Sequence, residues 1–322
     1  MKQYIIRRVC ISIVVLLGVS FMIYGLLRSM PGDFIDTMTS GNPAITAEQK
    51  EQLKEAYGLN GTIVEGYITW AKSAVQGDLG TSFLYQKPVT EVIGERMWTS
   101  FSLAAIAFVI QLCIAIPLGI IAANKQYTKI DYAIVFIALA GISLPSFFFA
   151  AVLQRVFAMG LDWVPLSGMI TARENFTGFR HIMDVGYHFI LPVIVFVVTG
   201  IGSWLRYVRT NMLEVLSADY IRTARAKGLP ERRVIYKHGF RNTLIPIATF
   251  IGAAIPSLFA GAIITEGIFS IPGLGQAGLD AIGASDLPFL MGYLMFMAAL
   301  TLLGTLISDI LYAVVDPRVR YN

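Results

Sequence analysis

Long apolar blocks, separated by charged segments, constrain the fold more than any other feature of this sequence. An α-helix needs about 20 such residues to cross a bilayer. Six blocks reach that length, at 9–27, 100–123, 132–159, 188–207, 244–265 and 288–315. Of the 322 residues, 56% are hydrophobic and only 14% are charged, which is too apolar for one globular core. We therefore expect an all-α membrane protein with six transmembrane helices.

The first block imitates the hydrophobic region of a signal peptide, because Lys2, Arg7 and Arg8 precede it. It is 19 residues long, however, and Leu-Arg-Ser-Met-Pro follows it in place of a small-x-small cleavage site. We interpret it as an uncleaved transmembrane helix. The third block is longer than one crossing needs, so we expect that helix to be tilted or to extend past the membrane.

Prolines and small residues inside the blocks predict how the helices bend and pack. Proline removes a backbone donor, so kinks are expected at Pro117, Pro145, Pro192, Pro246 and Pro256. Small residues allow helices to approach closely. The residues expected to do so are Gly200, Gly202, Gly252, Ala253, Ala254, Gly261 and Gly304. Two cysteines, Cys10 and Cys113, lie in apolar runs and are expected to be small buried side chains rather than a disulfide.

Lysine and arginine between the blocks predict the orientation in the membrane. Segment 206–243 carries nine of them against three acidic residues, whereas segment 266–287 carries none. We therefore expect both termini and segment 206–243 in the cytoplasm. Segment 28–99 then lies outside, where helical spacing at 46–57, with Thr46 and Gln49 as a capping box, and a turn at 77–80 predict a small extracytoplasmic domain.

Several kinds of chemistry have no support in the sequence. No Gly-Lys pair occurs, so the chain has no P-loop of its own, and the three histidines lack the spacing of a zinc site. The Gly-x-Gly-x-x-Gly pattern at 273–278 has no strand before it, and we regard it as a chance match. Arg155 and Asp309 are the clear ionisable residues inside blocks. Arg155 is expected to snorkel and Asp309 to reach cytoplasmic basic side chains, which disfavours a proton relay.

Segment 206–243 is charged but predicts two helices. The first runs from Glu214 to Lys227 and ends at Gly228, a C-cap position followed by Leu229-Pro230. The second runs over 231–242. A short helix held crosswise beneath a bundle is a mechanical contact for a partner protein. The alternative is a solvated basic loop attracted to anionic lipid headgroups, and the residues alone leave both open.

The motifs of this segment resemble those of a known family. Ala-Arg-Ala-Lys-Gly at 224–228, followed by His238, Arg241-Asn242 and Pro246, resembles the coupling loop of the binding-protein-dependent ABC importers. The leading carboxylate of the general motif is missing and the interval from glycine to proline is longer; both departures are similar to the oligopeptide/dipeptide permease branch. The stretches at 77–82, 88–90, 266–269, 271–275 and 316–321 resemble the first membrane subunit of that branch.

The resemblance implies the six-helix arrangement of a type I importer permease in a bacterial or archaeal cytoplasmic membrane. The chain then divides into an anchor helix at 1–27, an extracytoplasmic domain at 28–99, a five-helix core at 100–315 with a coupling loop at 208–243, and a tail at 316–322. The implied partners are a second permease, two ATPase subunits that hold ATP and magnesium, an extracytoplasmic substrate-binding protein and membrane lipid. Neither a nucleic acid nor a cofactor in this chain is expected.

On this reading the chain is not itself an enzyme but takes up peptides on ATP hydrolysis by its partners. The residues expected to couple to an ATPase are Asp219, Arg222, Ala224, Arg225, Lys227 and Gly228. Ser143, Ser257 and Thr265 are candidate pathway residues, although each hydroxyl can instead bond its own helix backbone. The outer segments 28–99 and 267–287 are candidates for docking the binding protein. The same machinery serves nickel chelates, glutathione or oligosaccharides in related systems, and a stand-alone carrier is a further alternative.

Overall fold

The computed structural model describes residues 2–29, 46, 48, 51 and 61–315, and within these ranges the chain is helical, with no strand beyond one isolated bridge between Thr81 and Pro88. Most of the predicted helix at 46–57, and all of the tail at 316–322, lie outside the described residues. The helices are α1 Lys2–Arg28, α4 Ile63–Val75, α5 Val89–Asn124, α6 Lys129–Ser143, α7 Ser146–Leu153, η1 Gln154–Gly160, α8 Phe179–Ser217, α9 Asp219–Ala226, α10 Glu231–Arg233, η2 Val234–Phe240, α11 Arg241–Phe259, α12 Ile263–Ile268, α13 Leu274–Gly283 and α14 Leu287–Val315.

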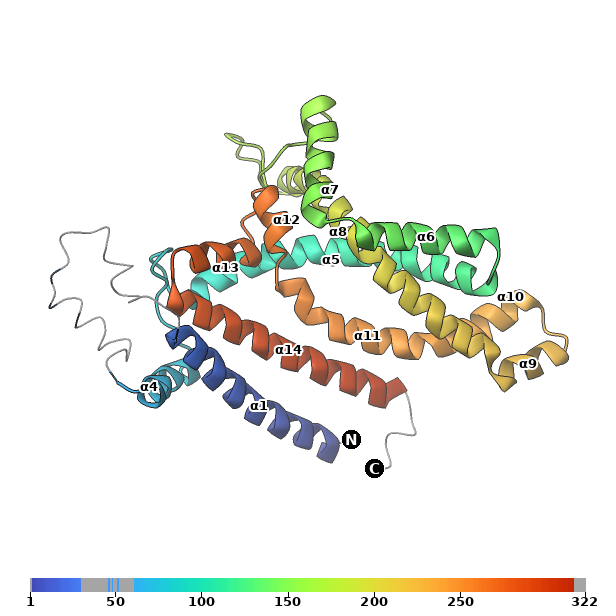
Figure 1. Ribbon diagram of the computed structural model, residues 1–322, viewed down its shortest axis with the longest axis horizontal. Helices are drawn as coiled ribbons and strands as arrows, with labels where there is room; N and C mark the ends of the chain where they lie inside the picture. Colours follow the sequence, from blue (N-terminus) through green and yellow to red (C-terminus); the bar gives the residue numbers. More distant parts are fainter. Residues whose placement is uncertain (1, 30–45, 47, 49–50, 52–60, 316–322) are drawn as a thin grey trace.

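Five stretches of helix in the described residues are long and apolar enough to cross a membrane. They are α1, α5, α8, the stretch Glu231–Ile268 that contains α11, and α14. These helices lie broadly along one axis in Figure 1, with α5 packed on α8, α11 on α14, and α1 on α14. The expectation of an all-α membrane protein is therefore confirmed, and a sixth span exists if α6 and α7 are counted together.

The sequence led us to expect one long helix for the third apolar block, either tilted or extending past the membrane. The structure shows a sharp bend instead. The block is two helices, Lys129–Ser143 and Ser146–Gly160, that meet at an angle of 94°. The break lies at Leu144, whose φ of −76° and ψ of 122° are extended, immediately before Pro145. Proline disfavours helical geometry in the residue before it and has no N–H to donate, so the block bends here. Figure 1 shows α7 standing nearly perpendicular to α6.

Helices α6 and α8 approach so closely that only glycine fits at their contact. A Cβ atom on Gly202 of α8 would overlap the carbonyl oxygen of Ala138, and one on Gly141 of α6 would overlap that of Val198. The contact of α11 with α14 is similar, because a Cβ on Gly304 would overlap the ring of Pro256. The expectation that Gly202 and Gly304 serve close helix packing is confirmed.

The expectation that both cysteines are buried is wrong. Cys10 of α1 and Cys113 of α5 are exposed free thiols on this chain. Their surroundings are apolar and exposed as well, with Val14 on α1 at 69% and Ile114 on α5 at 38% exposure. A helix flank of this kind meets lipid or another membrane helix rather than water, so a cysteine there needs no burial within its own chain.

We predict that Gly202→Ala destabilises the protein by about 1–3 kcal/mol, because the added methyl group forces α6 away from α8. Gly186 lies on the same helix α8 and is the matched control, since a Cβ there meets nothing within 4 Å. Gly186→Ala should be neutral or slightly stabilising, because alanine favours helix. Thermal unfolding of the detergent-purified variants compares the two; equal unfolding temperatures would contradict the packing described.

Candidate functional site

The segment expected to contact a partner lies at the end of the bundle where α1 begins and α14 ends (Figure 1). The predicted continuous helix from Glu214 to Lys227 is interrupted. Helix α8 stops at Ser217, Ala218 is extended with φ −70° and ψ 148°, and the chain restarts as α9. The interruption turns the chain, so α9 is a separate short helix that can lie across the end of the bundle.

The inner face of α9 is apolar and holds the helix in place. Ile221 and Ala224 are buried, at 0% and 6% exposure, against Val234 of η2. Leu216 and Leu229 pack at the edge of this cluster. Ala224, which the sequence placed among the coupling residues, therefore faces the chain's own core, and a larger side chain there would displace α9 from η2.

The outer face of α9 presents its charged residues. Asp219, Arg222 and Lys227 are exposed. A weak ion pair of 3.6 Å joins Arg222 Nη1 to Asp219 Oδ1, with side-chain exposures of 82% and 95%. A pair so open to solvent contributes little to stability, so both groups remain accessible to a partner.

Arg225, another of the residues predicted to couple, already has a partner within the chain; its contact with an ATPase stays a prediction. Its Nη2 lies 2.7 Å from Glu231 Oε1, and its Nε lies 3.2 Å from Glu231 Oε2. The two-point contact spans the turn between α9 and α10 and joins the two helices at the surface. Glu231 was not identified as a site residue from the sequence, although it lies six positions from Arg225.

The turn after α9 has the geometry of a glycine C-cap, as predicted. Gly228 has a φ of +72°, which disfavours other L-residues. Its N–H donates to the carbonyl of Arg225 at 2.9 Å, and the N–H of Leu229 donates to that of Ala224 at 3.4 Å, the two bonds of a Schellman motif. A Cβ at Gly228 would meet nothing within 4 Å. Glycine is thus required for backbone conformation and not for lack of space.

The second predicted helix does not end at residue 242. The chain passes from α10 through η2, a π-helix of seven residues, and continues without a break into α11. The segment from α9 to η2 is therefore joined to a long helix at each end, by the turn at Ala218 to α8 and directly to α11. Short π-helical stretches are frequent at functional sites in helices.

A buried ion pair braces the same end of the bundle. Arg209 of α8 contacts Asp131 of α6 at two points, with Nε–Oδ1 and Nη2–Oδ2 distances of 2.7 Å. Asp131 is 2% exposed and also accepts the N–H of Tyr127 at 3.0 Å. A second ion pair joins Arg8 of α1 to Asp309 of α14 at 3.2 Å. The expectation that Asp309 reaches a basic side chain is therefore confirmed. The structure shows the Arg209 pair, which local sequence patterns did not reveal.

The three candidate pathway residues do not form a cluster through side-chain bonds in the described residues. The hydroxyls of Ser143 and Ser257 are exposed and donate to carbonyls of their own helices, at 2.9 Å to Leu139 and 2.6 Å to Ala254. Thr265 is buried at 3% exposure. Backbone bonding, the alternative considered for these hydroxyls, thus occurs in two of them, and their contact with a substrate stays a prediction.

At the opposite end of the bundle a buried carboxylate organises the short helices α12 and α13. Glu266 is fully buried. Its Oε1 accepts the Ser100 hydroxyl at 2.7 Å and the N–H of Ala262 at 3.2 Å, and its Oε2 accepts the N–H of Gln276 at 2.9 Å. Ser100 Oγ in turn accepts the N–H of Leu274 at 2.8 Å. The free N–H groups at the start of α13 are thereby bonded to α12 and α5.

The Gly-x-Gly-x-x-Gly pattern has its explanation in this carboxylate. A Cβ atom on Gly273 would overlap the carboxyl group of Glu266, and one on Gly275 would lie 3.0 Å from Oε2. The glycines at the start of α13 therefore make room for an anion, as they do in nucleotide sites, but the anion is the chain's own side chain. This agrees with the interpretation of the pattern as a chance match.

Asp286 performs a similar function at the start of α14. Its Oδ2 accepts the Ser82 hydroxyl at 2.5 Å and the N–H of Leu84 at 3.1 Å, while its Oδ1 accepts the N–H of Phe289 at 3.1 Å. It thus caps α14 and attaches the loop before α5 to it. That loop begins with the predicted turn, in which Gly77 and Gly80 have φ of +85° and +89°.

We predict that Glu266→Ala destabilises the protein by more than about 2 kcal/mol, because it leaves the N–H groups of Ala262 and Gln276 without the buried acceptor they share. Asp280 is the matched control, since it lies on α13, is exposed and accepts the side-chain amide of Gln276 at 2.7 Å rather than a buried backbone N–H. Asp280→Ala should stay within about 0.5 kcal/mol of the parent. Thermal unfolding in detergent measures both, and a Glu266→Ala variant as stable as Asp280→Ala would refute the role assigned to the carboxylate.

Comparison with known proteins covers the chain from end to end. Residues 115–321 match the family described as "Binding-protein-dependent transport system inner membrane component", and residues 1–104 match the description of its N-terminal part. The oligopeptide transport system permease protein AppB of Bacillus subtilis is 41% identical over the full length of both chains. The dipeptide transport system permease protein DppB of Escherichia coli K12 is 35% identical, again with full coverage of both. A putative peptide permease protein of Brucella suis is 35% identical over 99% of each chain. With its spanning helices and with matches of this extent, the chain belongs to the family of inner-membrane components of binding-protein-dependent transport systems.

Proposed function

We propose that this chain is one permease subunit of an ABC importer that carries peptides into the cell. Support comes from relatives named as oligopeptide and dipeptide transport permeases, which match over their full length. In this proposal ATP hydrolysis takes place in partner ATPase subunits, and a binding protein delivers the substrate. A second, homologous permease, two ATPases and the six-helix type I arrangement complete the assembly. The relatives favour peptides over nickel chelates, glutathione or oligosaccharides.

The proposed coupling role rests on how α9 is placed, with one face buried against the chain and the other exposed. Its apolar face is buried against η2, while Asp219, Arg222 and Lys227 are exposed on the other side. In the proposed mechanism this outer face sits in a cleft of an ATPase subunit, and closure of the ATPase dimer on ATP pulls on α9. Helix α8 receives the motion; at 39 residues it is about 58 Å long and reaches the far end of the bundle. Alternating access would follow from movement of this rigid bundle.

The charge distribution supports the proposed orientation. The basic segment 206–243 and both termini are placed in the cytoplasm, where lysine and arginine accumulate. The end organised by Glu266 and Asp286 then faces outward, together with α4 and the loop at 161–178. We propose that segment 28–99 forms the small extracytoplasmic domain, and that segments 28–99 and 267–287 dock the binding protein at this end. Ser143, Ser257 and Thr265 remain the candidate contacts with the substrate.

We predict that Arg222→Glu lowers peptide uptake and peptide-stimulated ATP hydrolysis about tenfold, equivalent to roughly 1.4 kcal/mol of lost docking. The charge reversal occurs on an exposed side chain, so folding should be unaffected. Lys129→Glu is the matched control, because Lys129 is an exposed basic residue at the start of α6, at the same end of the bundle but outside α9. Uptake of a radiolabelled peptide by cells that produce each variant decides the matter. Equal uptake by both variants would remove α9 from the coupling mechanism.

A second prediction separates conformation from size at Gly228. Gly228→Val should reduce uptake severalfold, because a β-branched residue at a φ of +72° costs about 1–2 kcal/mol and reorients α9. Gly228→Asn should retain most uptake, since asparagine tolerates left-handed geometry and the space around the position is open. The measurement is uptake normalised to the amount of variant in the membrane. Loss of function in both variants alike would mean that side-chain bulk against a partner, rather than the turn, is what matters.

A further inference from the structure

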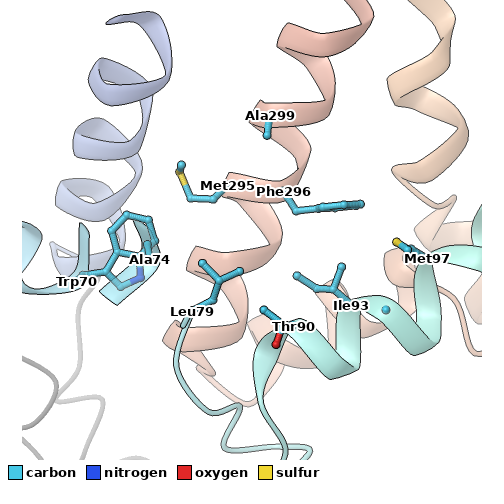
Figure 2. A pocket seen from close by; sticks show the side chains of 10 residues that line it. Trp70, Ala74, Leu79, Thr90, Ile93, Met97, Met295, Phe296 and Ala299 are labelled. Carbon is cyan, nitrogen blue, oxygen red and sulfur yellow. The ribbon is translucent and has the colours of Figure 1, made fainter. Parts of the chain in front are cut away.

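An apolar cavity of about 440 Å³ lies between α4, α5 and α14. Figure 2 shows its walls, with Trp70 and Ala74 from α4 on one side, Ile93 and Met97 from α5 below, and Met295 and Phe296 from α14 between them. Leu79, from the turn before α5, lies between these walls and also lines the cavity. Thr90 is the polar side chain in this lining. A space with such walls offers water few partners and fits an apolar occupant.

The position of the cavity along α14 places it at the depth of lipid chains. Helix α14 begins at Leu287, and Met295 and Ala299 are 8 and 12 residues further on, so they lie about 12 and 18 Å below its first residue. The hydrocarbon core of a bilayer is about 30 Å thick. Measured from the start of α14, the cavity therefore reaches the middle of a hydrocarbon core of that thickness, beside helices long enough to cross a membrane.

Helix α4, which forms the outer wall, has the character of a helix at the membrane surface. Its exposed side chains include Val64 at 52% and Val75 at 90%, which a water-facing helix would not favour. It is attached to α1 by a 2.7 Å hydrogen bond between the hydroxyls of Tyr67 and Ser20. Tyr67 and Trp70 lie beside each other with ring centroids 6.2 Å apart, as in the aromatic belt of membrane proteins.

We propose that this cavity binds one acyl chain of a membrane phospholipid, with α4 as the lid over it. The apolar lining, the depth beside α14 and the exposed apolar face of α4 all fit a lipid chain that enters sideways from the membrane. The site depends only on the placement of α5 and α14 in the membrane, and not on coupling to an ATPase. A bound chain would join α4 to the bundle and so hold the outer end in its folded arrangement.

Gly94 provides a way to fill the cavity without disturbing the fold. It lines the cavity on α5, and a Cβ atom there would meet nothing within 4 Å. Gly94→Leu therefore places a side chain in the empty space, in a helix that favours leucine over glycine. Gly18→Leu is the matched control, because Gly18 lies on α1, is exposed, and a Cβ atom there would likewise meet nothing within 4 Å.

The test uses Trp70 as a reporter in the full-length chain, with Trp98, Trp163 and Trp204 replaced by phenylalanine and the protein held in nanodiscs. Phosphatidylcholine brominated along its acyl chains should quench Trp70 fluorescence at least twofold relative to unbrominated lipid. Gly94→Leu should abolish most of that quenching, and Gly18→Leu should leave it unchanged. Equal quenching in both variants would overturn the proposal, because Trp70 would then sense only the surrounding lipid. Loss of Trp70 quenching on addition of the substrate-binding protein, with no effect of Gly94→Leu in its absence, would also overturn the proposal, in favour of a protein segment in the cavity.

A second measurement avoids the tryptophan replacements. Native mass spectrometry of the otherwise unaltered chain, after mild delipidation in detergent, should show one retained phospholipid. Gly94→Leu should lose that lipid, and Gly18→Leu should keep it. Identical lipid retention by the three proteins would contradict the proposed site.

Discussion

The requirement that every buried backbone group be bonded inside the chain governs this structure. Within the spanning helices, backbone N–H groups donate to carbonyls of the same helix. At the start of each helix the first N–H groups have no such carbonyl and need other acceptors. Buried carboxylates supply some of these acceptors here. Asp286 accepts the N–H of Phe289 in the first turn of α14, and Glu266 accepts that of Gln276 in the first turn of the short helix α13. Asp131 accepts the N–H of Tyr127 in the turn before α6. Each acid also contacts a side chain from a distant helix or loop, so the same groups that satisfy turns fix how the helices are joined.

The two ends are built differently, and the difference fits their proposed roles. At the end that contains α12 and α13, Glu266 and Asp286 are fully buried. Glu266 joins α12, α13 and α5, and Asp286 joins the start of α14 to the loop before α5, each through several bonds. At the other end α9 is held by a small apolar cluster, one exposed ion pair and a glycine turn, and its charges face outward. A helix held this way is firmly attached to α8 and α11 yet presents a surface to a partner. A rigid bundle between these two ends would carry movement from one to the other.

The sequence predicted the spans well but their ends and connections poorly. Apolar blocks locate the part of a helix in lipid; α5 nevertheless begins at Val89, eleven residues before its block, because Val89 and Val92 pack against Leu274 and Phe289. The break at Pro145 was visible as a kink, but its angle depends on what α7 packs against. The capping box of Thr62 and Glu65, a local signal, could have revealed α4. The pair of Asp131 and Arg209, 78 residues apart, depends on tertiary structure and has no local signal.

Contact between α9 and an ATPase subunit is the central claim, and site-specific photocrosslinking tests it most directly. Tyr220 of α9 is 47% exposed, so the larger side chain of benzoylphenylalanine can replace it and extend away from the bundle. The same probe at Phe179, 75% exposed at the start of α8, samples the opposite end of the bundle. We expect the probe at position 220 to form an adduct with an ATPase subunit, identified by mass spectrometry, and the probe at 179 to form none. Lipid adducts alone at position 220, or ATPase adducts at 179, would contradict the claim.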